Sequence, residues 1–407
     1  MKIRNSILIL TISIVAVLDT TASNLADIAA VIKPGNFRPL NTISPFDVWR
    51  FGVQNEPLFC FSNGGSWDPF AGRMLYCGAP HGNSMRFAAY EEVTNTWKIY
   101  PMPAGVDWAG AHSYDHQTID SSGIFYNLYW SDGVAYCFDT KTNKWISPLP
   151  ATNTGFGTLD YFPEANGLLR VVGGKVTFFS LKTRKWTTLT NVTMGYPHNI
   201  AQYCASGKFI YFGGGDNNNN FYIIDSTLRI KAVKQPPFPM SVTTAHLTQD
   251  PVSGTLLALR QDSLYAYDIS SDSWNSIAKN PVSTQEISHM AMIPINTYGV
   301  VALLSTSQWP VLLYKYRAPV SVESKRVKQL AVNLRANHNP FREQVTLSLP
   351  SGTTDISIFD LNGKHLFHQN TTGKSDIVWN ATKYPAGVYI VKTRGLGTFQ
   401  TLKLTLQ

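Results

Sequence analysis

FDTKTNKWISPLP, residues 138–150, is the stretch that decides the fold, because altered copies of it recur along most of the chain. The copies are AAYEEVTNTWKIYPMP (88–103), VTFFSLKTRKWTTL (176–189), FYIIDSTLRIKAVKQPP (221–237) and LYAYDISSDSWNSIAKN (264–280). When Trp97, Trp145, Trp186, Ile230 and Trp274 are taken as equivalent, the spacings are 48, 41, 44 and 44 residues. A period of this length is typical of the four-stranded blades of β-propellers.

Each copy has the pattern of a strand, a polar turn and a second strand. Val134, Tyr136 and Phe138 alternate as in a half-buried strand, and Asp, Thr and Asn then supply the turn. A small sheet cannot bury both of its faces alone, so neighbouring sheets must pack through their large side chains. We expect the Trp of the second strand to bury roughly 150 to 250 Å² there, or about 4 to 6 kcal/mol before entropy is subtracted.

The repeat resembles the kelch motif. In that motif a Gly pair ends the second strand of the unit, and it is followed by an apolar residue before Asp, a Thr-Asn turn and a Trp. Gly pairs stand at 173–174 and 213–215, and they are degraded to CGAP (77–80), WSDG (130–133) and LRQDS (259–263). Residues 34–319 are therefore identified as a divergent kelch-like β-propeller. This resemblance implies an architecture and says little about chemistry.

The number of repeat units predicts the number of blades. Units ending near 104, 150, 191, 237, 280 and 319 predict six blades, with seven as the alternative. The strand-like FRPLNT (37–42) is expected to complete the last blade beside VLLYKYRAP (311–319), which lacks a following Trp strand. Such closure removes exposed sheet edges.

Composition supports an all-β protein and argues against nucleic acid as a partner. The chain has 44% hydrophobic and 15% charged residues, and its 29 Gly and 23 Pro suit many short strands joined by turns. Its formal charge of +8 is scattered, apart from SKRVK at 324–328. We therefore expect no nucleic-acid partner, although a modest attraction to acidic polysaccharide is reasonable.

The two ends of the chain carry export signals. Residues 1–23 have Lys2 and Arg4, an apolar core and a small-residue end, as in a secretory signal peptide. No later segment has the 18 apolar residues in a row that a spanning helix needs, so we expect no further transmembrane segment. Residues 320–330 are predicted to be a linker, and residues 331–407 a second β domain.

This tail has motifs in a characteristic order. They are NPF (339–341), DLNGK (360–364), AGVYIVK (386–392) and the terminal TLKLTL (401–406). The tail resembles the C-terminal sorting domain of the type IX secretion system. The resemblance implies that the secretion machinery reads the tail as an address, leaving the first domain secreted or attached to the outer cell surface. On physical grounds alone the tail is a small β-sandwich with a turn at Asn362-Gly363.

The cysteines leave two alternatives open. Cys60 and Cys77 flank a predicted hairpin turn at 68–72, so they either form a disulfide or remain two buried thiols. No CxxC or Cys/His spacing indicates a structural zinc site, and no motif indicates a cofactor. Metal binding by two or three of the histidines near the innermost strands is left open as an alternative.

Histidines supply the main candidate site. One His stands near the start of the predicted innermost strand in four units, and these strands should bring the four side chains to the mouth of a central channel. Loops on the same face are expected to add other polar and aromatic groups. The predicted ligand-binding residues are His81, Asn83, Trp108, His112, His198, Asp216, His246 and His289.

Three interpretations of these residues compete. In the first, each histidine forms a hydrogen bond that ties its strand to a neighbouring blade. In the second, the histidines bind the hydroxyls of a carbohydrate that stacks on Tyr114, Tyr161 and Trp108. In the third, they catalyse a reaction on a polysaccharide. If the protein is a polysaccharide lyase, His112 or His198 would take the C5 proton of a uronic acid. Tyr114 or Tyr161 would act as the acid, and Arg170 or Arg260 would neutralise the carboxylate of the substrate.

Two other function classes were considered, a glycoside hydrolase and a protein-binding scaffold without a pocket. A glycoside hydrolase needs two facing carboxylates, and the candidates are scattered over different loops. These candidates are Asp115, Asp120, Asp160, Glu164 and Asp216. A surface scaffold that binds proteins through its loops is a further alternative. Carbohydrate binding is the preferred prediction, and whether the protein is an enzyme is left open.

Overall fold

The structure is a computed structural model that describes residues 25–43, 50–51, 56–80, 83–108, 112–283, 287–305, 311–317, 334–349, 353–361, 364–371, 374–395 and 398–407. The chain divides into two compact units, Met1–Val320 and Ser321–Gln407. The predicted signal peptide, the predicted linker, His81 and the turn at Asn362-Gly363 lie outside the described residues.

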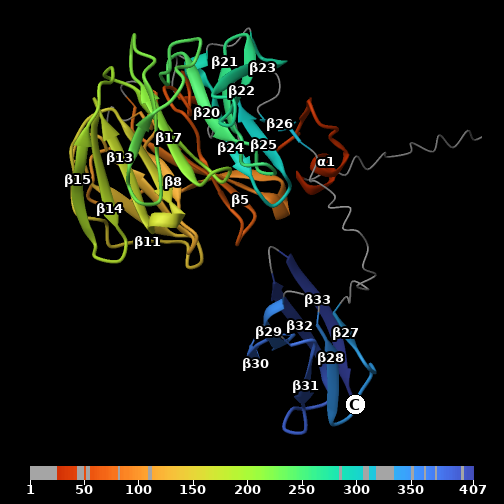
Figure 1. The fold of residues 1–407 in the computed structure, drawn as a ribbon. Helices are drawn as coiled ribbons and strands as arrows, with labels where there is room; N and C mark the ends of the chain where they lie inside the picture. The colour runs from red at the N-terminus through yellow and green to blue at the C-terminus, as the bar shows by residue number, and fades with distance from the viewer. Residues whose placement is uncertain are drawn as a thin grey trace, which may run out of the picture. The chain divides into compact units, whose positions relative to one another are not determined.

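Five consecutive stretches of the first unit each fold into a four-stranded antiparallel sheet, with the strands in chain order (Figure 1). Sheet I holds β4 (Ser66–Asp68), β5 (Arg73–Gly78), β6 (Arg86–Glu91) and β7 (Thr96–Tyr100). Sheet II holds β8 (Gln117–Ile119), β9 (Ile124–Leu128), β10 (Ala135–Asp139) and β11 (Lys144–Ile146). Sheet III holds β12 (Thr158–Phe162), β13 (Gly167–Val172), β14 (Lys175–Ser180) and β15 (Lys185–Asn191). Sheet IV holds β16 (Asn199–Cys204), β17 (Phe209–Gly214), β18 (Phe221–Ile224) and β19 (Ile230–Ala232). Sheet V holds β20 (Ala245–Gln249), β21 (Leu256–Arg260), β22 (Ser263–Asp268) and β23 (Ser273–Lys279).

Sheet VI joins the two ends of the first unit. It holds β24 (Ala291–Ile295), β25 (Val300–Leu304), β26 (Val311–Lys315) and, as its outer strand, β1 (Asn36–Pro39). The rings of Phe37 and Tyr314, which face each other in this pairing, lie 4.4 Å apart. The expected pairing of FRPLNT with VLLYKYRAP is therefore confirmed.

Short elements complete this unit. They are α1 (Leu25–Val31), the two-stranded sheet of β2 (Arg50–Phe51) and β3 (Glu56–Pro57), and the 3-10 turns η1 (Glu92–Thr94), η2 (Pro163–Ala165) and η3 (Ile287–His289). No helix in the described part of the chain has the length and apolar character needed to span a membrane.

The polar turn of the repeat has one backbone conformation in five sheets. The residue two positions before each Trp-equivalent position is left-handed, with φ between 47° and 62°. Asn tolerates this region better than most residues, which explains the Thr-Asn pair of the motif. The five residues are Asn95, Asn143, Arg184, Leu228 and Asp272.

The repeated Trp links neighbouring sheets. The indole Nε1 of Trp145 donates to Pro101 O at 2.7 Å, and that of Trp186 donates to Pro150 O at 2.8 Å. Trp274 donates to Lys234 O in the same way, at 3.2 Å. Each acceptor follows the last strand of the preceding sheet, so the indole connects two sheets as the repeat predicts.

The first strand of each sheet contacts the first strand of the next. β4 contacts β8, β8 contacts β12, β12 contacts β16, β16 contacts β20, β20 contacts β24, and β24 contacts β4. Isolated bridges between Asp115 and Thr158 and between Gly64 and Met292 are parallel. We call these six first strands the inner strands. They all begin at one end of the unit and end at the other.

Buried Asn63 connects several inner strands directly. Its main-chain N–H donates to Tyr114 O at 2.9 Å, and its Oδ1 accepts from Leu247 N at 2.6 Å. Its carbonyl accepts from Met292 N at 3.2 Å, and its Nδ2 donates to Ala201 O at 3.4 Å. One side chain and its backbone thus fasten sheet I to sheets II, IV, V and VI.

None of the four cysteines forms a disulfide, and all four are buried. The disulfide alternative for Cys60 and Cys77 is therefore wrong, and the alternative of buried thiols is right. The reason is register: β4 and β5 pair Ser66 with Leu75, so continuing the hairpin brings Gly64, not Cys60, opposite Cys77.

The second unit consists of two antiparallel sheets that share one hydrophobic core. One sheet holds β27 (Arg335–Ala336), β28 (Gln344–Ser348) and β31 (Asp376–Asn380). The other holds β29 (Thr353–Asp360), β30 (His365–Asn370), β32 (Gly387–Gly395) and β33 (Thr398–Leu406). The NPF motif fastens the last strand, because Asn339 Oδ1 accepts from Thr405 N at 2.7 Å and Phe341 N donates to Thr405 O at 2.9 Å. Phe341 also packs against Trp379, so the motif is part of the core.

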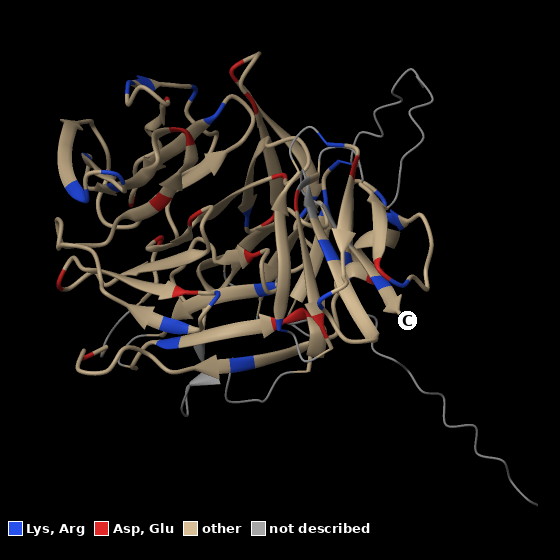
Figure 2. Ribbon diagram, turned by 90° about the horizontal axis from the view of Figure 1, so that it is seen from below, with Lys and Arg blue, Asp and Glu red and all other residues tan. Residues whose placement is uncertain are grey.

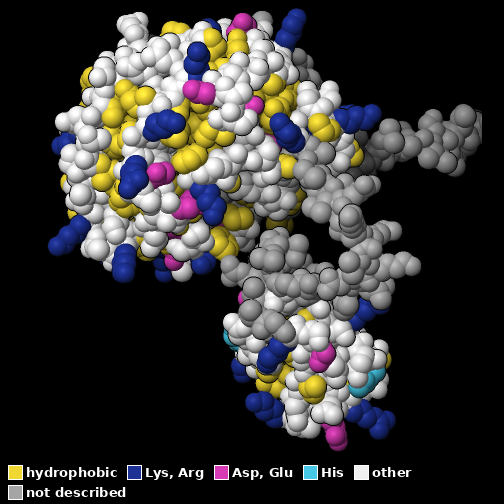
Figure 3. Space-filling model, in the orientation of Figure 1, with side chains coloured by type: hydrophobic (Ala, Val, Ile, Leu, Met, Phe, Trp, Pro, Cys, Tyr) yellow, Lys and Arg dark blue, Asp and Glu magenta, His cyan; other side chains and the backbone are white. Residues whose placement is uncertain are grey.

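The surface charges agree with the sequence prediction. Figure 2 shows Lys and Arg spread over many strands and turns, with Asp and Glu among them. The visible face in Figure 3 likewise has hydrophobic side chains interrupted by polar and charged ones.

Candidate functional site

Aromatic side chains gather where the inner strands begin. Phe61, Tyr114, Phe156 and His198 stand just before β4, β8, β12 and β16. The ring of Tyr114 lies 4.7 Å from that of Phe156 and 5.6 Å from that of His198, and Phe61 stacks on His198 at 6.1 Å. With Tyr196 these residues form what we call the aromatic cup.

The backbone of the cup is unusual. Phe61, Tyr114 and His198 have φ values of 48°, 48° and 69°, in the left-handed region that bulky residues rarely occupy. Such conformations persist only where surrounding contacts impose them, and they cluster at functional sites. The main-chain bonds of Phe61 to Ser288 O, 2.7 Å, and of His198 to Phe156 O, 3.2 Å, supply part of that constraint.

Tyr196 extends the cup into solvent. Its ring is stacked on Phe156 with an interplanar angle of 18° and a centroid distance of 6.0 Å, while the residue is 49% exposed. Trp130 packs on Phe156 at 4.8 Å and supports the stack. The cup therefore offers an exposed aromatic face on a packed base.

His198 is held by a carboxylate of its own sheet. Its Nδ1 lies 3.0 Å from both carboxylate oxygens of Asp216, and Ser241 Oγ donates to Asp216 Oδ1 at 2.9 Å. This arrangement favours the tautomer with its proton on Nδ1 and leaves Nε2 as an acceptor. His198 can therefore accept a hydrogen bond or a proton from a ligand in the cup.

The predicted histidines His112 and His246 bond to main-chain carbonyls of neighbouring sheets. His112 is buried, and its Nδ1 lies 3.0 Å from Ala79 O of sheet I. His246 is buried too, and its Nε2 bonds to Ile287 O at the start of sheet VI. Both geometries match the interpretation in which the histidine ties its strand to a neighbouring sheet. Burial also lowers the pKa of His246 to about 4, which keeps the ring neutral.

A fifth histidine, His116, stands immediately before β8 and also bonds to the neighbouring sheet, a role that was not predicted from the sequence. Its Nε2 accepts from Gly157 N of sheet III at 3.1 Å, and burial lowers its pKa well below the ordinary value. The half-buried His289 ends η3.

Several predicted residues lie away from the cup. Trp108 is buried against Tyr129 and Tyr136, 5.0 and 4.8 Å away, and is part of the packing. Asn83 is half-buried, with its N–H on Pro80 O at 3.3 Å. The structure therefore brings His112, Tyr114, His198 and Asp216 together, and it does not bring Trp108 to them.

The basic residues proposed for the lyase are already engaged within the protein. Arg170 is fully buried and donates to the carbonyl oxygens of Thr158, at 3.1 Å, and Gly155, at 2.6 Å. The guanidinium of Arg260 lies over the ring of Phe238, 5.2 Å from its centroid. Neither group is offered to a carboxylate ligand beside His198.

A cavity of about 290 Å³ lies between the inner strands. Residues of all six inner strands or of their ends line it, including Ser66, Trp67, Gln117, Thr118, Leu159, Tyr161, Ala201, Tyr203, Gln249, Met292 and Asn296. Asp115, Asp120 and Asp160 line it as well, so the prediction that these carboxylates are scattered is wrong for the three. Tyr161, predicted beside the histidines, belongs here.

The carboxylates of this cavity are engaged by the backbone. Asp115 Oδ2 accepts from Ala201 N at 2.6 Å, and Asp160 accepts from Tyr161 N at 2.8 Å and from Tyr203 N. Burial raises the pKa of both groups, that of Asp160 to about 6. Carboxylates that fasten neighbouring strands are poor candidates for the acid and nucleophile of a glycoside hydrolase.

Comparison with known proteins assigns the tail. Residues 339–407 match the family model described as "Secretion system C-terminal sorting domain". This match confirms the predicted type IX sorting domain, so the chain interacts with that secretion machinery and is directed to secretion and attachment at the outer cell surface. A search of curated proteins found no match to the chain. The kelch resemblance of residues 34–319 therefore rests on the repeat residues alone.

Proposed function

We propose that the first unit is a closed six-bladed, kelch-like β-propeller that binds extracellular carbohydrate in the aromatic cup at the cell surface. The contact of β24 with β4, together with the pairing of β1 with β26, supports closure. Each of sheets I to VI then forms one blade, and the cup lies at one mouth of the central channel.

The exposed, stacked ring of Tyr196 carries the carbohydrate proposal. An aromatic face that is rigid and open to solvent suits stacking against the apolar face of a pyranose ring. His198 Nε2 lies beside it as an acceptor for a sugar hydroxyl, and Asp216 fixes its orientation. A sugar in this place meets a packed floor of Phe156 and Tyr114.

A second candidate, proton abstraction by His198, is favoured by the same carboxylate. The Asp216 contact makes Nε2 a general base, and Tyr114 lies near it as an acid whose pKa burial raises. Without a guanidinium in the cup to neutralise a uronate, we rank this lyase reaction second. A pocket-free scaffold finds no specific support in the faces shown in Figure 3.

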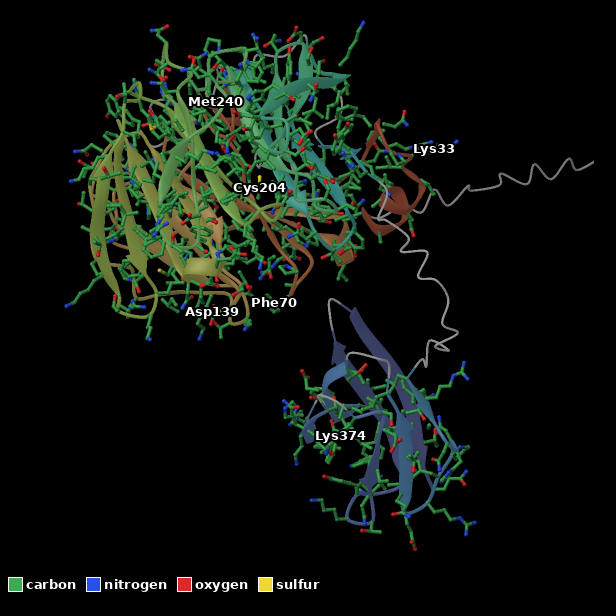
Figure 4. All side chains as sticks on the ribbon, in the orientation of Figure 1. Lys33, Phe70, Asp139, Cys204, Met240 and Lys374 are labelled. Carbon is green, nitrogen blue, oxygen red and sulfur yellow. The ribbon has the colours of Figure 1, made fainter. Side chains whose placement is uncertain are left out.

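Glycan-array binding with the secreted protein tests the proposal. Tyr196→Ala should weaken binding about tenfold, equivalent to ~1.4 kcal/mol, while Tyr196→Phe, which keeps the aromatic face, should retain it. Phe70→Ala is the matched control, because Phe70 is 38% exposed and lies toward the opposite end of the first unit from Met240 (Figure 4). Unchanged binding by Tyr196→Ala at unchanged melting temperature refutes the cup as the site.

The same preparations separate binding from cleavage. Incubation with acidic polysaccharides should give no unsaturated products, read by ultraviolet absorbance, if the protein only binds. If such products form and disappear in His198→Gln while binding persists, the lyase reaction replaces the binding role.

A further inference from the structure

The cavity between the inner strands differs in charge from the protein as a whole. The chain carries a formal charge of +8, yet the described residues that line the cavity include three aspartates and no Lys, Arg or His. A low-dielectric pocket with one sign of charge concentrates that field on its contents. Burial raises the pKa of Asp115 and Asp160, and a bound cation would favour their charged forms whereas an anion would oppose them. The cavity therefore favours a cation over an anion.

Two buried polar groups in the lining lack a protein partner. Ser66 is 5% exposed, and no hydrogen bond engages its Oγ among the described residues. Gln249 is 8% exposed, and its Oε1 accepts from Ala205 N at 3.0 Å, which leaves Nε2 without a described partner. Both residues line the cavity, so these two groups can form hydrogen bonds with a polar occupant.

The lining suits an organic cation better than a metal ion. The carboxylates of Asp115 and Asp160 already accept main-chain hydrogen bonds, and the described residues hold no group of three or more His, Cys, Asp or Glu placed to bind a metal. Aromatic rings of Trp67, Tyr161 and Tyr203 are also in the lining, and rings attract organic ammonium groups.

We propose that this cavity binds a small hydroxylated ligand that carries a protonated amine and is about the size of a monosaccharide. The ammonium lies near the aspartates, while Ser66 Oγ and Gln249 Nε2 bond to its hydroxyls. The volume of about 290 Å³ accommodates one such ring. None of the cup residues lines this cavity, although Asp115 of the lining directly follows Tyr114 of the cup.

Calorimetric titration of the secreted full chain at pH 7 tests the proposal with three probes of equal size. Glucosamine is cationic, glucose is neutral and glucuronate is anionic. We expect glucosamine to bind, glucose to bind at least tenfold more weakly, and glucuronate not to bind. Equal binding of glucosamine and glucose overturns the charge argument, and absence of all binding overturns the site.

Two variants locate the binding. Gln249→Glu keeps an acceptor for Ala205 N and replaces the amide by a second negative oxygen, so it should tighten glucosamine binding at least fivefold. Ser66→Val removes the hydroxyl and adds a methyl group, so it should weaken binding at least tenfold. Tyr196→Ala should leave glucosamine binding unchanged, and if that variant abolishes it, the amine binds in the cup and the proposal is wrong.

Discussion

His246→Gln tests whether the inner-strand histidines are structural ties. The glutamine amide can still donate to Ile287 O, but it carries no proton equilibrium near neutral pH. In the native protein the imidazole is buried and its pKa is lowered to about 4, whereas in the unfolded chain it returns to the ordinary value of about 6.5. Between these two values the unfolded state binds more protons, so stability is lost as the pH falls.

The magnitude follows from the two pKa values. Across the whole window from above pH 6.5 to below pH 4 the loss is roughly 3 kcal/mol, and between pH 7 and pH 5 it is about 2 kcal/mol. His246→Gln should lack this contribution, so its loss of unfolding free energy between pH 7 and pH 5 should be about 2 kcal/mol smaller than that of the native protein. The comparison of slopes removes the titration of Asp160, which both proteins share.

Urea unfolding followed by tryptophan fluorescence at pH 5, 6 and 7 measures the slope. His289→Gln controls for the substitution itself, because it makes the same change at a half-buried position just before the neighbouring sheet. If His246→Gln shows the same dependence as the native protein, His246 is not held neutral by burial, and its assignment as a tie between sheets V and VI fails.

Other perturbations address the remaining contacts. Trp186→Phe keeps the ring but loses the donation to Pro150 O, so urea unfolding should show a loss of about 1 kcal/mol; no change indicates that the indole bond is dispensable. Gly214→Ala should abolish soluble folded protein, because φ is +71° and the new Cβ would meet Met240 O at 1.5 Å; a variant with a native melting temperature contradicts this. Removal of residues 339–407 should leave the protein off the cell surface in a surface-labelling assay, and normal display contradicts the address role.

The repeat could be predicted because its signals are local. A left-handed turn two residues before each Trp needs only neighbouring residues, and Asn143 before Trp145 shows it directly in the sequence. The pairing of β1 with β26 also followed from the sequence, since the final unit lacked its fourth strand. The disulfide alternative failed because the hairpin register, which places Gly64 opposite Cys77, is not visible in the spacing of the cysteines.

The candidate site could be predicted only in outline. The sequence placed His112, Tyr114, His198 and Asp216 together, but it could not tell a tying histidine from an available one. That distinction depends on main-chain acceptors such as Ala79 O, which lies in another sheet and carries no residue-specific signal. The cavity aspartates were named as candidates, but their grouping was not predicted, because they meet only when parallel inner strands align.

The partners of the histidines explain how a divergent repeat keeps its fold while one member becomes available for binding. His112 and His246 bond to backbone carbonyls of neighbouring sheets, and such acceptors survive almost any substitution at Ala79 or Ile287. His198 instead pairs with a side chain of its own sheet, Asp216, and is half-buried beside an exposed tyrosine. A histidine that only ties two sheets together does not require a carboxylate partner, because His112 and His246 form their ties with main-chain carbonyls. The carboxylate is therefore best explained by the orientation of His198 toward something that enters the cup.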